Sequence, residues 1–261
     1  MKDQFVIACV ENAAGAAAVL PWTRHFAEHL RHKSLMLLHV SEQKEDDSWL
    51  KATGVPYVSL CGDWTTAVEG IPTAFNGILA VAAVNPKAPR TSLTHPSTLL
   101  HHFRNCKTAY LCIRMDGGDT SHPRVDTAVL TMTHRREGKE MLVWASYLAR
   151  FLGSNVTIAH PDYQDKDLRM RWRNNMRFAD KVFNPLELHY RTATVDSSTR
   201  PDLAALDELH PDLLIARTTD PRERDLVDWL LPRPELRLLA HPSTTPLLLL
   251  NPRDDLYILC D

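Results

Sequence analysis

The chain has 261 residues, of which 44% are hydrophobic and 24% charged, a balance typical of a globular protein with a sizeable core. The net charge of -2 gives no reason to expect a nucleic-acid-binding protein, and no apolar run reaches the roughly 18 residues needed to span a bilayer. The first residues, MKDQFVIACVENAAG, contain no long apolar run, so no secretory signal is expected. Five cysteines without a C-x-x-C pair are typical of reduced thiols, and we expect a cytoplasmic protein.

Apolar runs and helix-like segments alternate through the first half of the chain. Runs such as FVIACV and LMLLHV are almost wholly apolar, which is typical of parallel strands buried on both faces. Strands are expected over residues 5–10, 35–40, 55–60, 77–84 and 107–113. Apolar residues at helical spacing predict helices over 13–32, 64–75 with Asp63 as its N-cap, and 93–103 with Pro96 in its first turn.

The pattern restarts after the polar stretch MDGGDTSHP, which predicts a linker over 115–123 between domains over 1–114 and 124–261. Strands are expected over 127–132, 156–160, 186–195, 212–216 and 245–250. Helices are expected over 137–152, 165–183, 201–209 and 222–231.

The two halves also share a sequence repeat. AVLPWTRHFAEHL in the first half corresponds to EMLVWASYLARFL in the second, with Trp22 and Trp144 at an offset of 122 residues. Each half alternates strand and helix, which favours a parallel sheet covered on both faces. The sequence therefore predicts an α/β protein made of two tandem five-stranded parallel-sheet domains.

Three stretches resemble the universal stress protein family in its tandem two-domain form. They are VIACVENAAGAAAVLPW, LMLLHV with its terminal His-Val, and LRLLAHPSTTPLLLLNP at residues 236–252. The resemblance implies the adenine nucleotide alpha hydrolase-like fold of that family. It also implies that the final strands of the halves, 109–113 and 247–250, meet in an intramolecular pseudo-dimer related by a pseudo-two-fold axis.

The chain departs from the nucleotide-binding members of this family at three features. Those members end the first strand in an aspartate, whereas the halves here have Cys9-Val10-Glu11 and Met132-Thr133-His134. They also carry a glycine-rich phosphate loop, but all nine glycines here lie at or before Gly153. The family spacing places Asp220, Glu223 and Arg233 at the three glycine positions of the second half. We therefore expect no useful ATP binding in either half, and no cofactor.

The first half has a loop that is more favourable to anions than the corresponding loop of the second half. Its cations and hydroxyls are compatible with a bound phosphate or sulfate, and equally with an ordinary exposed loop. The candidate contacts for an anion or nucleotide are Val10, Glu11, Val40, Asn85, Lys87, Arg90, Thr91 and Ser92.

Other patterns leave alternatives open. His102 and Cys106 lie one helical turn apart and fit either a zinc pair or a helix surface; His134-Arg135-Arg136 follows a strand end and could receive an anion. No G-x-S-x-G elbow, GxGxxG or Walker loop is present. The predicted helix 165–183 carries Lys166, Arg169, Arg173, Arg177 and Lys181. These residues suit either a solvated face or a surface that engages an acidic partner or nucleic-acid phosphates.

The resemblance implies a cytoplasmic stress-related regulatory or scaffold protein without catalytic turnover. Its expected partner is a protein that the sequence does not identify, with a homodimer as a further option and nucleic acid not expected. Two alternatives remain at this point: a nucleotide- or anion-sensing regulatory domain of the type linked to ion transporters, and a weak nucleotide hydrolase.

Overall fold

The computed structural model describes residues 3–30, 33–42, 47–116, 122–134, 138–195, 203–219 and 233–252. These residues divide into two compact units, one within residues 1–123 and one within 124–252, here called unit 1 and unit 2. Within the described ranges, no helix combines the length and the apolar character that a membrane crossing requires.

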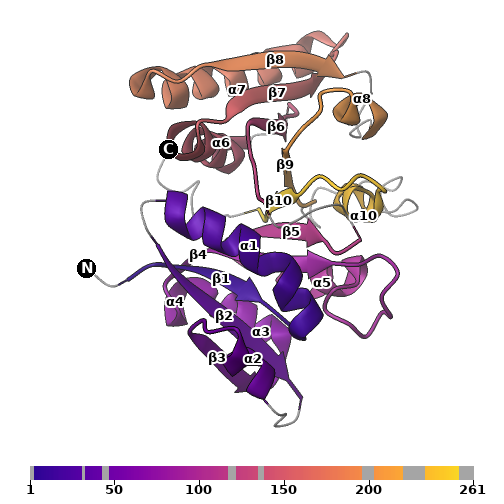
Figure 1. The fold of residues 1–261 in the computed structure, drawn as a ribbon. Coiled ribbons are helices and arrows are strands. Elements are labelled where there is room, and N and C mark those ends of the chain that lie inside the picture. The colour runs from indigo at the N-terminus through magenta and orange to yellow at the C-terminus, as the bar shows by residue number, and fades with distance from the viewer. Residues whose placement is uncertain are drawn as a thin grey trace. The chain divides into compact units, whose positions relative to one another are not determined.

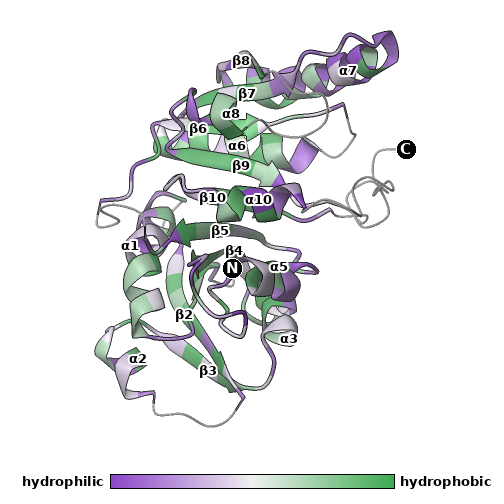
Figure 2. Cartoon of the chain, turned by 90° about the vertical axis from the view of Figure 1, so that its right-hand side faces the viewer, coloured by the Kyte–Doolittle hydropathy of each residue, from purple (hydrophilic) through white to green (hydrophobic). Residues whose placement is uncertain are grey.

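Unit 1 contains a five-stranded parallel sheet with the order β3-β2-β1-β4-β5. Figures 1 and 2 show α1 on one face of this sheet and α3 and α5 on the other. The strands are β1 (Phe5–Cys9), β2 (Ser34–Ser41), β3 (Tyr57–Cys61), β4 (Gly77–Val84) and β5 (Ala109–Arg114). The helices are α1 (Ala13–His29), α2 (Ser48–Ala52), α3 (Trp64–Glu69), α4 (Ile71–Ala74) and α5 (Pro96–Phe103).

Unit 2 repeats this architecture with the strand order β10-β9-β6-β7-β8, again parallel throughout. The strands are β6 (Thr127–Thr131), β7 (Asn155–Pro161), β8 (Tyr190–Val195), β9 (Leu213–Arg217) and β10 (Leu247–Leu250). The helical segments are α6 (Lys139–Leu152), α7 (Lys166–Phe183), the short 3₁₀ turn η2 (Asn184–Leu186), α8 (Leu203–Asp207) and α10 (Pro234–Ala240). The predicted fold class, two tandem parallel α/β sheets, is confirmed.

The sequence repeat is also a repeat in strand register. Cys9 of β1 pairs with Leu38 of β2, and Thr131 of β6, at the same offset of 122 residues, pairs with Ala159 of β7. His39 and His160 each follow these partners directly, so the two histidines occupy equivalent positions. A slip of one residue would move every apolar side chain to the opposite face of its sheet, which is why register persists where both faces are buried.

Local sequence signals explain how several elements begin. The Asn12 side chain accepts from the Gly15 N–H at 2.9 Å and caps α1, and Asp165 accepts from two N–H groups at 2.9 Å to cap α7. Gly77 opens β4 where the chain passes close to its neighbours. A Cβ there would lie 2.5 Å from Ile71 Cγ2 and 2.6 Å from Ile7 Cδ1, so only glycine fits without displacing the core.

Two predicted helices were wrong in extent. The single helix expected over 64–75 is divided into α3 and α4 at Gly70, next to Pro72, which has no N–H to continue the helical bonds. The helix expected from Leu93 begins at Pro96, because the preceding residues turn back so that the Asn85 N–H donates to the Thr94 carbonyl.

Other boundaries also differ from the prediction. The strand expected from Leu186 begins at Tyr190, because η2 ends in Glu187 with a left-handed φ of 55°. Helix α2 was not predicted, since its five residues are too short for a periodic pattern to emerge. The predicted helix over 222–231 lies outside the described residues.

Candidate functional site

Ligands of open parallel sheets bind at the carboxyl ends of the strands, where the strand order reverses. In unit 1 that point lies between β1 and β4, which are neighbours in the sheet but not in the chain. Val10 and Glu11 follow β1, and residues 85–92 follow β4. Most of the candidates from the sequence therefore gather at this place, here called the unit 1 edge.

The backbone amides of the loop after β4 donate hydrogen bonds within the loop itself. The Asn85 N–H donates to the Thr94 carbonyl at 2.8 Å, and the Lys87 N–H donates to the Asn85 side-chain oxygen at 3.0 Å. The Ser92 N–H donates to the Pro89 carbonyl at 2.9 Å. A phosphate loop needs free amides directed at the ligand, and these three are already bonded within the loop.

Glu11 and Ser92, 81 residues apart in the chain, meet at the unit 1 edge. The Ser92 hydroxyl donates to the Glu11 carboxylate at 2.5 Å. Its oxygen also lies 2.8 Å from Thr94 Oγ1 and accepts from the Thr94 N–H at 3.2 Å. Because a serine hydroxyl has one proton, Ser92 has none left for a phosphate, and a negative charge already sits beside it.

The other candidates of unit 1 are not drawn together. Val10 is buried; its N–H donates to the Leu38 carbonyl at 2.9 Å, and its own carbonyl lies 2.9 Å from His39 Nδ1. Val40 is buried within β2. The remaining three, Lys87, Arg90 and Thr91, have exposed side chains. Two cations therefore remain near the edge without forming an enclosed anion site with Ser92.

The equivalent edge of unit 2 lies between β6 and β9, and an aromatic side chain contacts the segment that follows β6. Tyr163, from the loop after β7, is only 7% exposed. Its hydroxyl accepts from the His134 N–H at 2.9 Å and lies 3.2 Å from His134 Nδ1, while the two rings meet edge to face at 5.4 Å. The Asn175 side chain of α7 donates to the Thr133 carbonyl at 2.9 Å. Sequence reasoning missed Tyr163; an aromatic residue just past a strand end, in PDYQD, was the available signal.

A second hydroxyl–carboxylate pair stands at the β9 side of this edge. The Thr219 hydroxyl donates to Glu235 Oε2 at 2.9 Å, and Glu235, in the first turn of α10, is 2% exposed. The carboxylate thus lies where the positive end of a helix favours negative charge. Of the residues expected to replace the phosphate-loop glycines, Asp220 and Glu223 lie outside the described residues, as do Arg135 and Arg136 after His134.

Two histidine–aspartate pairs lie outside the edges, and neither forms a catalytic pair. His102 Nδ1 lies 2.9 Å from Thr65 Oγ1 and 3.7 Å from Asp63 Oδ1. A hydroxyl nucleophile needs the aspartate on one ring nitrogen and the hydroxyl on the other. Here both groups meet the same nitrogen, so the arrangement joins α5 to α3 and does not activate Thr65.

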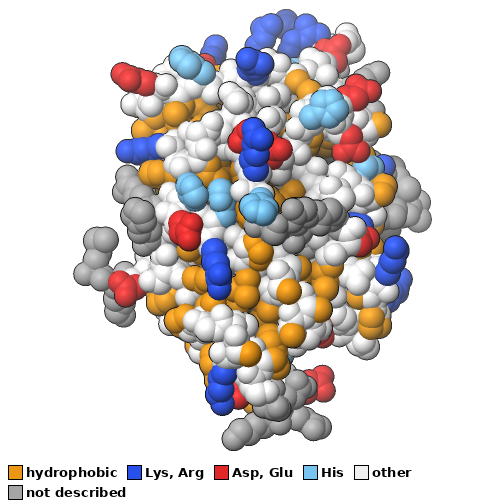
Figure 3. All heavy atoms as spheres, viewed as in Figure 1, with side chains coloured by type: hydrophobic (Ala, Val, Ile, Leu, Met, Phe, Trp, Pro, Cys, Tyr) orange, Lys and Arg blue, Asp and Glu red, His pale blue; other side chains and the backbone are white. Residues whose placement is uncertain are grey.

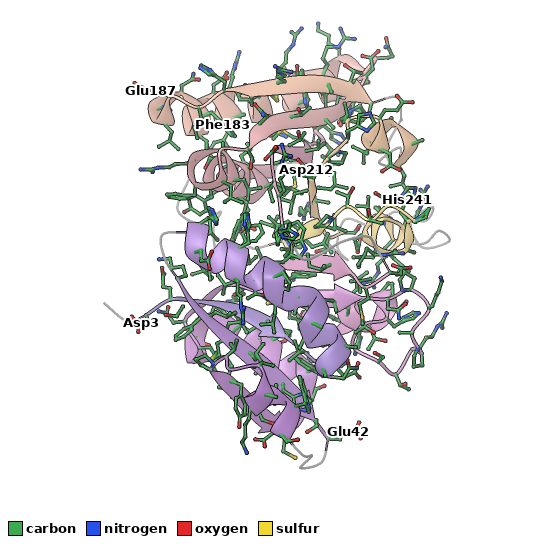
Figure 4. The ribbon with its side chains drawn as sticks, in the orientation of Figure 1. Asp3, Glu42, Phe183, Glu187, Asp212 and His241 are labelled. Carbon is green, nitrogen blue, oxygen red and sulfur yellow. The ribbon has the colours of Figure 1, made fainter. Side chains whose placement is uncertain are left out.

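The second pair borders a small depression, partly open to solvent, that is lined by residues of α8 and α10. His241, labelled in Figure 4, follows α10. Its Nδ1 lies 3.7 Å from Asp207 Oδ2 and accepts from the Ser243 N–H at 3.3 Å. The Ser243 hydroxyl donates to Thr245 at 3.0 Å. Again the aspartate and the serine residue meet the same ring nitrogen, Nδ1, so His241 is not placed to activate the Ser243 hydroxyl.

No metal centre is formed by the residues that the structure describes: no three His, Cys, Asp or Glu side chains gather there. His102 is engaged by Thr65 and Asp63, whereas the Cys106 thiol lies 3.5 Å from the Val68 carbonyl in the core. Burial raises the pKa of Cys106 to about 11, which keeps this thiol protonated near neutral pH. The geometry therefore does not support a zinc pair, which was one of the two alternatives that the sequence left open for these residues.

The sequence matches no protein-family model and no curated protein. Solved structures do match. A universal stress protein from Archaeoglobus fulgidus DSM 4304 has a TM-score of 0.65 at 13% identity, over 96% of this chain and 97% of that one. A structure from Pseudomonas aeruginosa UCBPP-PA14, also named as a universal stress protein, has a TM-score of 0.59 at 15% identity, covering 99% and 96%.

A third match is the cytoplasmic domain of a prokaryotic cation chloride cotransporter, with a TM-score of 0.57 at 13% identity over 95% of each chain. Identities this low establish the fold alone. The fold is that of tandem universal stress proteins, in agreement with the resemblance seen in the sequence, and both units fall within the matched length.

Proposed function

We propose that this chain is a cytoplasmic regulatory or scaffold protein of the stress response, which acts by binding a protein partner and neither binds nor hydrolyses ATP. The fold shared with universal stress proteins supports the regulatory role. The observation that carries the rest is the Ser92–Glu11 hydrogen bond at the unit 1 edge. It puts the chain's own carboxylate against the hydroxyl that a phosphate would need.

Several missing contacts together reduce the affinity for ATP. Each missing phosphate or ribose contact costs about 1–3 kcal/mol, and each 1.4 kcal/mol weakens binding about tenfold. Unit 1 has neither a glycine loop nor a free Ser92 proton. Unit 2 has Tyr163 against the segment that follows β6 and the buried Glu235 carboxylate beside Thr219. Losses of this size move a micromolar site to millimolar or weaker.

Calorimetry with ATP and magnesium tests the proposal on the full chain. We expect no binding heat at protein concentrations that would detect a Kd of about 10 μM, equivalent to roughly 7 kcal/mol. A tighter Kd, lost in an Arg90→Ala variant, would contradict the proposal. Phosphate release above that of a heat-inactivated sample, abolished by Glu11→Gln, would favour the hydrolase alternative.

A second candidate is an anion-sensing regulatory domain of the kind linked to ion transporters. The observation that favours it is the fold shared with the cotransporter cytoplasmic domain, together with exposed Lys87 and Arg90 beside the unit 1 edge. It requires that inorganic phosphate or sulfate binds without nucleotide. A phosphate titration followed by thermal unfolding, with sodium chloride at equal ionic strength as control, distinguishes this candidate from the first.

A further inference from the structure

We infer that the solvent face of α7 is a docking surface for an acidic polypeptide segment. This surface, here called the α7 basic face, consists of Lys166, Arg169, Arg173, Arg177 and Lys181, all exposed. Four of them recur at every fourth residue, so their Cα atoms follow one stripe in steps of about 6 Å over about 18 Å. Figure 3 shows Lys and Arg side chains gathered at the end of unit 2 where α7 and β8 lie.

The nearby acids form no ion pair with this face. The Asp165 carboxylate caps α7, Asp180 accepts from the Tyr190 hydroxyl at 2.6 Å, and Asp162 accepts from the Gln164 side chain at 2.8 Å. Within the described residues, no carboxylate lies within 4.0 Å of any of the five cations.

The cations themselves make few internal contacts. Arg169 donates to the Tyr163 and Gln164 carbonyls, and Arg177 donates to the Asn174 side chain at 3.3 Å. The other three have no polar partner among the described residues. Since the whole chain has a net charge of -2, the positive charge here is a local concentration and not a property of the entire surface.

The opposite face of α7 argues against a membrane as the occupant. Ala179 and Phe183 are fully buried, and the Trp172 ring packs on His160 with centroids 4.1 Å apart. Figure 4 labels Phe183 at the end of α7 that leads to Glu187. A surface helix that binds a bilayer inserts its apolar face into the lipid, and here that face is already occupied by the unit's own core.

One apolar side chain favours a polypeptide over a nucleic acid. Met170, 56% exposed, lies on the α7 basic face between Lys166 and Arg173. An exposed methionine is an adaptable anchor for an apolar side chain, whereas single-stranded nucleic acids gain from aromatic side chains on which the bases stack, and the residues of this face include no aromatic one. An acidic helix with carboxylates at i and i+4 repeats every ~6 Å and matches the arginine spacing.

The inference rests on the proposed function, because it supplies a surface for its protein partner. The probe is a fluorescein-labelled helical peptide of about 18 residues, with Glu at every fourth position and one Leu beside the central Glu. Binding to the full chain is measured by fluorescence anisotropy at low salt. We expect saturable binding that weakens about tenfold in Arg173→Glu, a loss of ~1.4 kcal/mol, and that weakens further as salt is raised.

Arg171→Glu is the matched control. Arg171 is exposed on the same helix, about 160° around it from Arg173, so the same charge reversal there should change the Kd less than about twofold. Equal losses in the two variants, or no binding to the wild-type chain, would overturn the inference. A single-stranded oligonucleotide of the same charge that binds as tightly as the peptide, and is weakened as much by Arg173→Glu, would also overturn the inference. Failure of the peptide leaves the ATP calorimetry unaffected, and ATP binding leaves the peptide result standing, so the two proposals fail separately.

Discussion

The carboxyl edges of units 1 and 2 occupy the same place in a repeated fold and are filled by different chemistry. In unit 1 the chain sends a carboxylate, Glu11, across to the hydroxyl of Ser92. In unit 2 the buried ring of Tyr163 contacts His134, in the segment that follows β6. A carboxylate–hydroxyl pair recurs there as well, but Glu235 comes from α10 and its partner Thr219 from the end of β9.

The difference shows which features of the repeated fold are the same in both units and which are not. Strand register is retained between the halves, as the Cys9–Leu38 and Thr131–Ala159 pairs show, because most side chains of β1 and β6 are buried among packed neighbours. The edge residues lie in loops, where substitutions are tolerated. At each edge the residues therefore contact one another within the protein, but by different interactions. Unit 1 uses mainly polar bonds, and unit 2 uses packing and a buried carboxylate.

Removing the Tyr163 ring should have the largest effect and tests whether packing dominates in unit 2. Tyr163→Ala leaves a cavity and removes the hydroxyl that accepts from the His134 N–H, and we expect a loss of about 3–5 kcal/mol in the free energy of unfolding. Urea unfolding measures it. Tyr163→Phe, which keeps the ring, should lose only about 1 kcal/mol; equal losses in the two variants would show that the hydroxyl, not the ring, holds this edge.

The two hydroxyl–carboxylate pairs should differ in strength. Thr219→Val leaves the buried Glu235 carboxylate without its hydroxyl donor, so we expect a loss of about 1–3 kcal/mol. Ser92→Ala leaves the half-buried Glu11 free to bind water, and a loss of about 0.5–1.5 kcal/mol follows. Paired urea unfolding curves compare the variants, and a larger loss for Ser92→Ala would reverse the ranking of the two edges.

Removing the Glu11 carboxylate tests whether it is what keeps anions away from the unit 1 edge. Glu11→Ala frees the Ser92 hydroxyl beside Lys87 and Arg90, and we expect sulfate to stabilise this variant more than the wild-type chain. At a sulfate concentration ten times its Kd the gain is ~1.4 kcal/mol, read from thermal unfolding against sodium chloride at equal ionic strength. A variant no more sensitive to sulfate than the wild type would show that the closed loop, and not the carboxylate, excludes the anion.

Most of the fold follows from short-range signals in the sequence. The strands are buried apolar runs, and β4 has the bounds expected from GILAVAAV. The N-cap at Asp63 was also predicted correctly. The helix over 64–75 failed because its apolar pattern continues through Gly70 and Pro72, where the backbone geometry, not hydrophobicity, sets the break.

The candidate site was less accessible to sequence reasoning. The residue types at the unit 1 edge were identified, but the bond between Glu11 and Ser92 joins positions 81 residues apart, and no local pattern encodes such a contact. Tyr163 and Glu235 were missed because a polar loop and the first turn of a helix normally place such side chains in solvent. Only the tertiary fold shows that these two are buried.

A pH series sharpens the unit 1 side of the comparison, with the smallest expected effect. Burial lowers the pKa of His102; the charge of His101 lowers it further and the charge of Asp63 opposes the shift. Burial also lowers the pKa of His25; the charge of His29 lowers it further and the charge of Glu28 opposes the shift. The unfolded chain therefore binds more protons than the folded one as pH falls through about 6.5, so the free energy of unfolding decreases there. Burial raises the pKa of Asp63, but hydrogen bonds from Thr66 and Thr65 outweigh it and the net shift is downward, so its contribution changes only below about pH 4. Urea unfolding at pH 7.5 and 5.5 should thus give a smaller decrease for His25→Gln/His102→Gln than for the wild type. Equal decreases would place the pH-sensitive groups elsewhere in the chain.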